Sequence, residues 1–521
     1  MGCGQAARER VWAPGSFDFW SMLLLGVSLV FQCAHWREFP LYLDAYYHLA
    51  AMRGFAAAGG WVGTAFWEYA PVGRPHVYPP FYHLLQLTMA GVGIAPLDIA
   101  RFFEVAAFPV FLLVFWYITR RLYSAGAAFF FLILATSVRM FLYVLSNNIP
   151  ATLAAICGGL AWYSLLRRRY GSAGVFLLFS LYSHSLIPWL FLGGIGLYCA
   201  GKARRAAFYR LTGICLAGAA PLVYHQLRYF RFIQYIRVPE MFIFEIGLLQ
   251  TFIFCVAVIV LWKRRAEYRL LYLLAMMLVP FLITHWNRFF SGYGLLPFLM
   301  LAGIFLEQCR RQLTPAAQRL FPAAAFLLLH LAAPSIIALP DAVRVECSGS
   351  WLAEQCGVGK PLDVIKNRGL LFQGIFPELA QIILSRTQPG EIIDAPYRYV
   401  AGILSVLTGR PTASAMLQEV RPFANFDRHR HTALYVALRQ EPGGAEPPEV
   451  AHLQQRYSFT VCERTPTAVI LKNTQPTAQV TPIPAVIPAK VCFGIIGCLL
   501  ALVILEHTLR RQPGRRDSRA A

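Results

Sequence analysis

Runs of apolar residues about as long as a membrane is thick recur along the chain, and short polar segments separate them. About 20 apolar residues in a helix cross the hydrocarbon core of a bilayer. The pattern therefore predicts a polytopic α-helical membrane protein. The first run lacks a small-residue cleavage site and is expected to stay as an anchor. The predicted spans are 17–35, 101–119, 123–142, 148–166, 171–184, 186–200, 206–224, 245–262, 269–284, 290–307, 320–339 and 491–507.

Basic clusters between the apolar runs set the predicted topology. Arginine and lysine gather on the cytoplasmic side of membrane proteins, and an even number of predicted spans lies between neighbouring clusters. Both termini are therefore expected in the cytoplasm, with about 12 spans between them. The clusters are Arg8/Arg10, Arg120/Arg121, Arg167–Arg169, Lys202–Arg205, Lys263–Arg265, Arg310/Arg311 and Arg510/Arg511.

One further apolar segment, 79–95, would break this even count if it crossed the membrane. It opens with Tyr78-Pro79-Pro80 and is interrupted by Gly91 and Gly93. Prolines and glycines at these places favour a short helix at the membrane surface, or a re-entrant one, on the outer side.

The chain is therefore expected to have three parts. Residues 1–339 form a multi-span domain with a long first outer loop, 36–100. Residues 340–489 form an outer, mixed α/β domain, because strand-like runs (391–394 and 467–471) alternate with helix-like runs (378–385 and 398–407). Residues 490–521 hold the final span and a basic cytoplasmic tail, after an extended linker, 474–488.

Composition supports the membrane interpretation and changes the meaning of the charge. Of the 521 residues, 57% are hydrophobic and 14% are charged, whereas soluble proteins carry roughly a quarter charged residues. The net charge of +21 would suggest nucleic acid in a soluble protein. Here residues 340–489 are nearly neutral, so the excess belongs to the membrane part, where it sets topology, and we expect no nucleic-acid partner.

The first candidate for chemistry is Asp44, just beyond the first span. It lies among leucine and tyrosine residues, where a carboxylate is costly to bury unless a metal ion, an arginine or a substrate proton pairs with it. A solvated carboxylate, or a cap for a helix over 45–55, is the alternative.

A second group of candidates follows in the same outer loop. Residues 67–80 combine aromatic side chains and prolines with Glu68, Arg74, His76 and Tyr78. Such a segment suits a rigid wall at the level of the lipid headgroups. Arg74 could bind a phosphate and Glu68 could join Asp44 at a metal ion. A structural proline-rich loop with a satisfied arginine is equally compatible.

Two other groups lie on predicted outer corners. The amide oxygens of Asn147 and Asn148 could bind a hard cation, or the pair could cap the next helix. Arg228, Arg231 and Arg288 break the positive-inside trend, which favours capture of a lipid phosphate. Pairing with nearby acids or with headgroups is the alternative. The sequence holds no P-loop, H-E-x-x-H or G-x-S-x-G pattern, which argues against an ATP-driven pump or a metalloprotease.

The segment Asp44-Ala-Tyr46-Tyr47-His48-Leu49 resembles the Asp-x-(Trp/Tyr)-Tyr-His-Leu motif of oligosaccharyltransferase catalytic subunits, which belong to the GT-C class of membrane glycosyltransferases. The following Tyr78-Pro79-Pro80 is similar to an element common in that class. The resemblance implies that Asp44 binds a divalent cation, manganese or magnesium, and contacts the acceptor. It also implies that Tyr47 and His48 lie against substrate.

Two other motifs of that family are altered here. The second acidic motif, Asp-x-Asp, would fall at Asn147-Asn148. The acceptor motif Trp-Trp-Asp-Tyr-Gly would fall at Ile392–Tyr397, where only Asp394 is kept. The resemblance thus implies a substrate contact for Asp394 but not recognition of an Asn-x-Ser/Thr acceptor.

These observations predict an inverting glycosyltransferase of a prokaryotic plasma membrane. It would take a sugar or oligosaccharide from a polyprenyl-(pyro)phosphate donor to an unknown acceptor at the outer face, among membrane lipids. Arg228, Arg231 or Arg288 would hold phosphate, and Asp44 would act as general base or metal ligand. A transporter of lipid-linked glycans, with Glu104, Glu245 or His330 inside spans, and a catalytically inactive scaffold are the alternatives.

Overall fold

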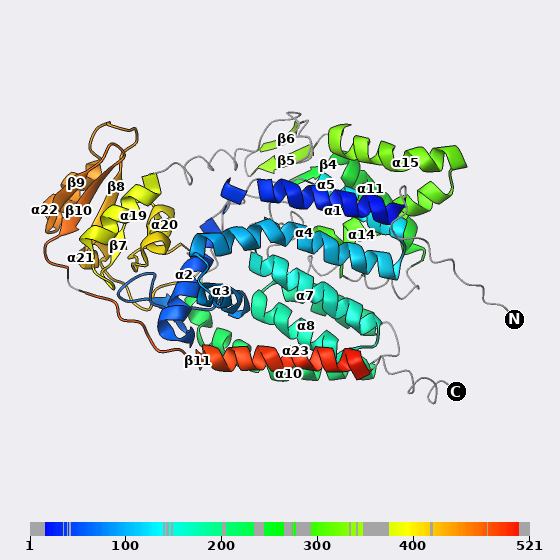
Figure 1. The fold of residues 1–521 in the computed structure, drawn as a ribbon, viewed down its shortest axis with the longest axis horizontal. Helices are drawn as coiled ribbons and strands as arrows, with labels where there is room; N and C mark the ends of the chain where they lie inside the picture. Colours follow the sequence, from blue (N-terminus) through cyan, green and yellow to red (C-terminus); the bar gives the residue numbers. More distant parts are fainter. Residues whose placement is uncertain are drawn as a thin grey trace.

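The protein is mostly helical in a computed structural model that describes residues 16–34, 36–38, 40, 43–138, 141, 145–146, 149–200, 205–233, 244–264, 273–274, 276–277, 293–332, 335–339, 342–346, 375–416, 420–476 and 478–509. A bundle of long helices makes up most of the molecule, and a smaller unit with a β-sheet lies beyond one end of it (Figure 1).

The bundle is built from the predicted apolar runs. Inside a bilayer each backbone polar group has to be satisfied within the segment, which leaves the helix as the form of a single span. The helices are α1 (Phe17–Ala34), α4 (Pro96–Leu122), α5 (Ala125–Ser137), α7 (Ile149–Leu166), α8 (Tyr170–Ser183), α9 (Ile187–Ala200), α10 (Arg205–Arg228), α11 (Leu248–Trp262), α14 (Leu296–Arg311), α15 (Pro315–Leu327) and α23 (Ala489–Leu509).

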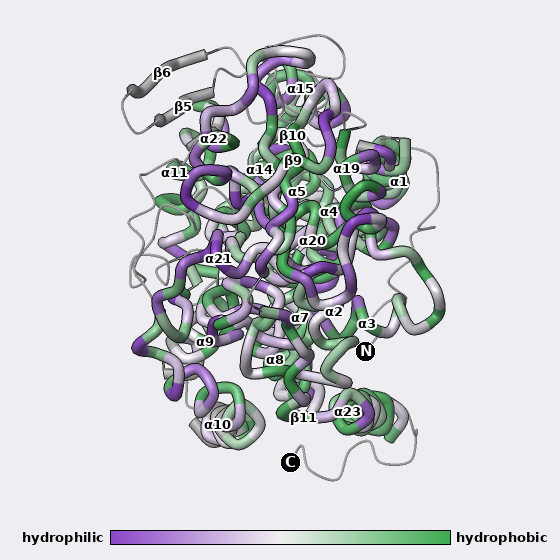
Figure 2. Tube along the Cα trace, turned by 90° about the vertical axis from the view of Figure 1, so that its left-hand side faces the viewer, coloured by the Kyte–Doolittle hydropathy of each residue, from purple (hydrophilic) through white to green (hydrophobic). Residues whose placement is uncertain are grey.

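Four of the described helices are long and apolar enough to cross a membrane, namely α1, α4, α7 and α23. The prediction of a helical membrane protein is thus confirmed, while the number of spans stays a prediction. Helix α23 lies at the edge of the molecule, with a largely hydrophobic trace (Figure 2). Its apolar side chains, such as Leu502 and Ile504, are exposed in the isolated chain, as expected where lipid is the neighbour.

The predicted span 320–339 is wrong in its last part. Helix α15 and a π-helical turn (Leu328–Ala332) are followed by strand β5 (Ser335–Leu339). This strand pairs antiparallel with β4 (Phe244–Gly247) and β6 (Ala342–Glu346). The sequence places Pro334 at the break, and a proline cannot continue the helical hydrogen bonds. The isoleucines that follow it favour a strand.

The segment 36–100, predicted as the first outer loop and called so below, opens with a short 3-10 helix, Trp36–Glu38. It continues with α2 (Leu43–Ala58), three two-residue strands and α3 (Phe81–Gly91). The 11 residues of α3 extend for about 16 Å, roughly half the thickness of a bilayer core. The prediction of a short helix that does not span is confirmed, and its depth in the membrane stays a prediction. The strands are β1 (Gly60–Trp61), β2 (Thr64–Ala65) and β3 (Arg74–Pro75).

The smaller unit contains a four-stranded sheet in the order β7 (Ile393–Asp394), β8 (Leu434–Leu438), β10 (Ala468–Asn473) and β9 (Phe459–Arg464). Only the β7–β8 pair is parallel. The strands predicted at 391–394 and 467–471 and the helices predicted at 378–385 and 398–407 are all present, the helices as α19 (Ile375–Arg386) and α20 (Arg398–Thr408).

Alternation along the strands gives this sheet two apolar faces. Leu434 and Val436 belong to the same buried cluster as residues of α19 and α20. Tyr435 and Ala437 face the other way, into a cluster with α22 (Pro448–Arg456). A two-residue period places successive side chains on opposite faces, so helices cover both sides of the sheet.

The first outer loop lies between the bundle and this sheet (Figure 1). One continuous buried cluster contains residues of α2, of the loop and of α20. The loop strand β1 also pairs antiparallel with β11 (Ile487–Pro488), directly before α23. The loop is therefore packed against both the smaller unit and the start of the last helix.

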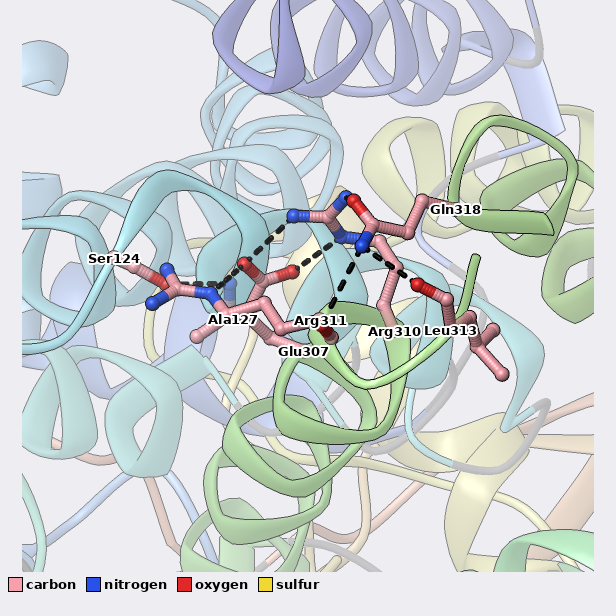
Figure 3. A network of polar contacts seen from close by, with 7 residues as sticks. All are labelled: Ser124, Ala127, Glu307, Arg310, Arg311, Leu313 and Gln318. Atoms are coloured by element: carbon pink, nitrogen blue, oxygen red, sulfur yellow. Dashed lines mark hydrogen bonds and ion pairs between the residues drawn. The ribbon is translucent and has the colours of Figure 1, made fainter. Parts of the chain in front are cut away.

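Basic residues gather at the opposite end of the bundle. Arg120 forms two 2.6 Å hydrogen bonds to Asp18, and Arg310 lies 4.8 Å from the ring centroid of Phe17. Glu307 accepts hydrogen bonds from Arg310 and Arg311, at the point where α14 meets α5 (Figure 3). Two of the clusters used to predict the cytoplasmic side thus lie together, away from the first outer loop.

Candidate functional site

A tight turn brings together the two charged residues of the first outer loop. The amide of Gly73 donates to the carbonyl of Tyr69 at 2.8 Å, which places Glu68 before the turn and Arg74 after it. Arg74 Nε donates to Glu68 Oε2 at 2.9 Å. The two side chains are 1% and 0% exposed. Burial alone would lower the pKa of Arg74, but Glu68 and Tyr47 together outweigh it and raise that pKa above its ordinary value.

Tyr47 joins this ion pair to a layer of histidines. The guanidinium carbon of Arg74 lies 5.5 Å from the Tyr47 ring centroid. The Tyr47 hydroxyl lies 3.4 Å from His76 Nδ1. From the end of α10, His225 Nε2 donates to the carbonyl of His76 at 2.7 Å. Helix α10 is thereby fixed against the first outer loop.

A second contact joins α2 to α3. His48 Nδ1 and His83 Nε2 share a 2.9 Å hydrogen bond, and both rings are buried. Burial lowers the pKa of His83 to about 3 and the pKa of His48 well below its ordinary value. Both imidazoles are therefore neutral near pH 7, and one of them donates the proton of the shared bond. The ring of Tyr78 packs edge-on against His48, 5.0 Å between centroids.

Asp44 lies at the exposed rim of this cluster. It is in the first turn of α2, one helical turn before His48, and its side chain is exposed. The structure thus places Asp44 inside the helix rather than at the cap position. Its charge reaches Tyr78, whose pKa is raised by burial first and then by Asp44.

Two of the predicted phosphate-binding arginines lie beside the loop. Arg228 ends α10, and Arg231 is in the following 3-10 turn, Phe230–Phe232. Both are exposed, with guanidinium carbons 5.4 Å from the Tyr229 ring centroid and 5.0 Å from that of Phe232. The nearby contact of His225 with His76 brings this corner to the first loop. Arg288, Asn147 and Asn148 lie outside the described residues.

Asp394, unlike Asp44, is fully buried. Its side chain is 0% exposed. Oδ1 accepts a 2.5 Å hydrogen bond from Ser414 Oγ, and Oδ2 lies 3.6 Å from Arg428 Nε. Burial raises the pKa of Asp394, although Arg428 and the hydrogen bonds oppose that rise.

The expected divalent cation has no obvious set of ligands here. In the described part of the chain, no group of three or more His, Cys, Asp or Glu side chains is arranged to hold a metal ion. Glu68, the expected partner of Asp44, is bonded to Arg74. The described residues alone therefore do not fit the cation, and manganese or magnesium at Asp44 stays a prediction.

The structure brings together Tyr47, His48, Glu68, Arg74, His76 and Tyr78, all predicted from the sequence. It adds His83, which the sequence analysis did not single out, and it brings His225 of α10 to the same cluster. His83 stands two residues into α3, right after the Tyr-Pro-Pro element. A histidine in the first turn of a mostly apolar helix, three residues after Pro80, was the available signal for it.

Solved structures with the same fold were found, whereas no protein-family model matches the sequence and no curated protein matches it. ArnT from Cupriavidus metallidurans bound to undecaprenyl phosphate aligns with a TM-score of 0.54 at 13% identity, covering 88% of this chain and 99% of that one. Its apo form gives a TM-score of 0.53 at 14% identity, covering 88% and 98%.

The archaeal oligosaccharyltransferase AglB from Archaeoglobus fulgidus, in complex with an inhibitory peptide and a dolichol-phosphate, gives a TM-score of 0.50 at 11% identity. The match covers 81% of this chain and 69% of that one. At such identities the likeness establishes the fold alone. The chain has a divergent GT-C fold, as the resemblance in the first outer loop implied.

Proposed function

We propose that the protein is an inverting membrane glycosyltransferase that uses a polyprenyl-phosphate or polyprenyl-pyrophosphate sugar as donor. The observation that carries the proposal is the buried Glu68–Arg74 pair, whose guanidinium lies against Tyr47 of α2, the helix that carries the exposed Asp44 in its first turn. Two buried opposite charges are costly to maintain, and perturbed ionisable groups of this kind cluster at functional sites. The fold shared with ArnT, which binds undecaprenyl phosphate, supports a lipid-linked donor.

Arg228 and Arg231 are proposed to hold the donor phosphate, together with Arg288. An arginine offers a planar fork of donors that matches phosphate oxygens. Both described guanidinium groups are exposed, next to aromatic rings, at the corner where α10 meets the first loop. Arg74 is buried and paired with Glu68, so it does not capture the free lipid. In this scheme its charge stabilises the negative charge that develops on the departing phosphate.

Asp44 is proposed as the general base. The carboxylate takes the proton of the acceptor nucleophile, which attacks the anomeric carbon from the face opposite the phosphate. The bond between that carbon and the phosphate oxygen breaks, and its electron pair leaves with the phosphate. Arginine charge stabilises the departing group. Attack from the opposite face accounts for the proposed inversion.

The same proposal places the site on the outer side of a prokaryotic plasma membrane. The first outer loop and the sheet unit share backbone hydrogen bonds, such as Thr412 N to Trp67 O at 2.9 Å. They therefore lie on one side of the membrane. The basic helix ends lie at the other end of the bundle, which the positive-inside trend assigns to the cytoplasm. The count of about 12 spans and the outer domain 340–489 belong to this proposal.

A transporter of lipid-linked glycans is the second candidate, because Glu104 is buried in α4. The charge of Glu104, however, acts on Tyr46 and Tyr82 of the first outer loop. Burial raises the pKa of both tyrosines most, and Glu104 is the next largest cause. The pKa of Tyr46 is raised to about 12. This position favours a part in the loop site over an ion site at mid-membrane.

The test is sugar transfer or release by the purified protein from a panel of labelled polyprenyl-linked donors. Wild type, Asp44→Ala and the control Asp98→Ala would be compared, with manganese and with chelator. Asp98 is a half-exposed acid in the first turn of α4, as Asp44 is an exposed acid in the first turn of α2, so it serves as the matched control. Turnover that is lost only in Asp44→Ala supports the enzyme, and loss with chelator supports the cation.

Two other outcomes would overturn the proposal. Donor binding without turnover, together with donor movement across reconstituted vesicles, would make the protein a transporter. If the protein neither binds nor turns over any donor, the remaining interpretation is a catalytically inactive scaffold.

A further inference from the structure

A short segment of the smaller unit lies between its sheet and the turn that carries Glu68 and Arg74. On the sheet side, Ile393 N donates to Pro411 O at 2.9 Å, and Ala413 N donates to Ile393 O at 3.1 Å. On the loop side, Thr412 N donates to Trp67 O at 2.9 Å, and its carbonyl accepts from Ala70 N at 3.0 Å. Residues 411–413 thus continue the sheet into the first outer loop.

The same unit contacts both ends of the turn. Tyr69 N donates to the carbonyl of Ser414 at 3.3 Å, directly after Glu68. At the other end, Phe423 N donates to the carbonyl of Gly73 at 3.1 Å, directly before Arg74. The two residues of the ion pair are therefore each one position away from a backbone bond to the smaller unit.

The backbone of the turn needs such support at Tyr69. Its φ is +49°, in the left-handed region that bulky side chains rarely adopt. Residues in sparsely populated conformations persist where their surroundings fix them, and they occur often at functional sites. The bonds from residues 412 and 414 meet this residue and the next one.

The anchor of the segment is the contact between Ser414 and Asp394. Ser414 Oγ donates to Asp394 Oδ1 at 2.5 Å, and both residues are buried. Asp394 is the last residue of β7, a buried two-residue strand at the edge of the sheet. The Ser414 hydroxyl donates to Asp394, and the Ser414 carbonyl accepts a hydrogen bond from Tyr69 N. Ser414 therefore connects the sheet to the turn.

We propose that Asp394 and Ser414 are positioning residues that set the geometry of the Glu68–Arg74 pair through the backbone of the turn. The proposal rests on the proposed function for its effect on transfer. Under this proposal Asp394 affects the reaction without contacting the acceptor, because its carboxylate is buried and bonded to Ser414. The smaller unit then serves as the support on which the charged turn is held.

Hydrogen exchange tests the positioning without any need for activity. In Ser414→Ala the backbone amides of Tyr69, Ala70 and Gly73 should exchange up to about tenfold faster, the factor that corresponds to one lost hydrogen bond. Ser414→Thr keeps the hydroxyl and should restore slow exchange. The control is Ser385→Ala, whose exposed hydroxyl bonds only within α19. Unchanged exchange at all three amides in Ser414→Ala would overturn the proposal.

A double-mutant comparison then tests the route to the reaction. Ser414→Ala should lower kcat more than it raises the donor KM in the wild-type background, and should cause little further loss in Glu68→Gln, because both changes act on one pair. Equal factors in the two backgrounds would show that Ser414 acts only through general stability. If the wild type transfers no sugar, the proposed function fails while the exchange result still decides whether Asp394 and Ser414 position the turn.

Discussion

Arg74 and Glu68 are joined by a 2.9 Å hydrogen bond across a tight turn, and both side chains are closed to solvent. Removing one partner of such a pair leaves an unpaired buried charge, which costs roughly 3–5 kcal/mol. We expect Arg74→Met and Glu68→Leu each to lower the free energy of unfolding by about that amount. The double variant should lose clearly less than the sum. Thermal unfolding of the three variants measures this, and additive losses would contradict a direct pairing.

The buried histidines should make the protein sensitive to acid. The pKa of His83 is about 3 in the folded state, against about 6.5 when unfolded. The unfolded chain thus binds more protons between these values, so stability is full above about pH 6.5 and falls as the pH drops toward 3. Each such histidine adds up to about 1.4 kcal/mol per pH unit to the slope.

His83→Gln should therefore flatten the fall in unfolding temperature between pH 6.5 and 4, even if the variant is less stable at pH 7. The exposed His452 offers a control, since His452→Gln should leave the slope as it is in the wild type. An unchanged slope in His83→Gln would mean that this ring is not held neutral in the folded state.

The two exposed arginines should act on the donor rather than on the fold. Arg228→Gln and Arg231→Gln are each expected to raise the donor KM roughly tenfold, the loss of one charge-assisted hydrogen bond. The unfolding temperature should stay unchanged. Arg456→Gln is the matched control, because Arg456 likewise lies over an adjacent tyrosine, 5.9 Å from the ring centroid of Tyr457, but in the sheet unit. Equal donor KM values in all four proteins would remove both arginines from the site.

The far end of the bundle allows a prediction about helix packing. A Cβ placed on Gly126 of α5 would collide with the carboxylate of Glu307, which binds Arg310 and Arg311 (Figure 3). Gly126→Ala should thus cost about 1–3 kcal/mol through overpacking. A Cβ added to Gly213 of α10 would meet no atom of the described residues within 4 Å, so Gly213→Ala should be neutral or stabilising. Similar unfolding temperatures for the two variants would contradict the tight contact.

Local pattern in the sequence was enough to predict most helices, the short helix α3 and the strands β7 and β10, because apolar length and alternation are properties of one segment. It was also enough to single out Arg74, whereas Tyr47 and His48 came from the resemblance to oligosaccharyltransferase catalytic subunits. It could not pair Glu68 with Arg74, since that depends on a turn held by Ser414 and Phe423, several hundred positions away. Strand β5 was missed for a related reason, because its partners lie elsewhere in the chain.

Pairing between β1 and β11 has a consequence for how the protein is made. The strand partners of Gly60 and Trp61, Pro488 and Ile487, leave the ribosome long after them, because the smaller unit and most of the bundle are synthesised in between. A side chain at position 60 would collide with the carbonyl of Ile487, so the fit is specific. The charged loop therefore receives strand β11 as a partner only when the start of α23 has been made, and a nascent chain halted before that point would carry a loop without this strand.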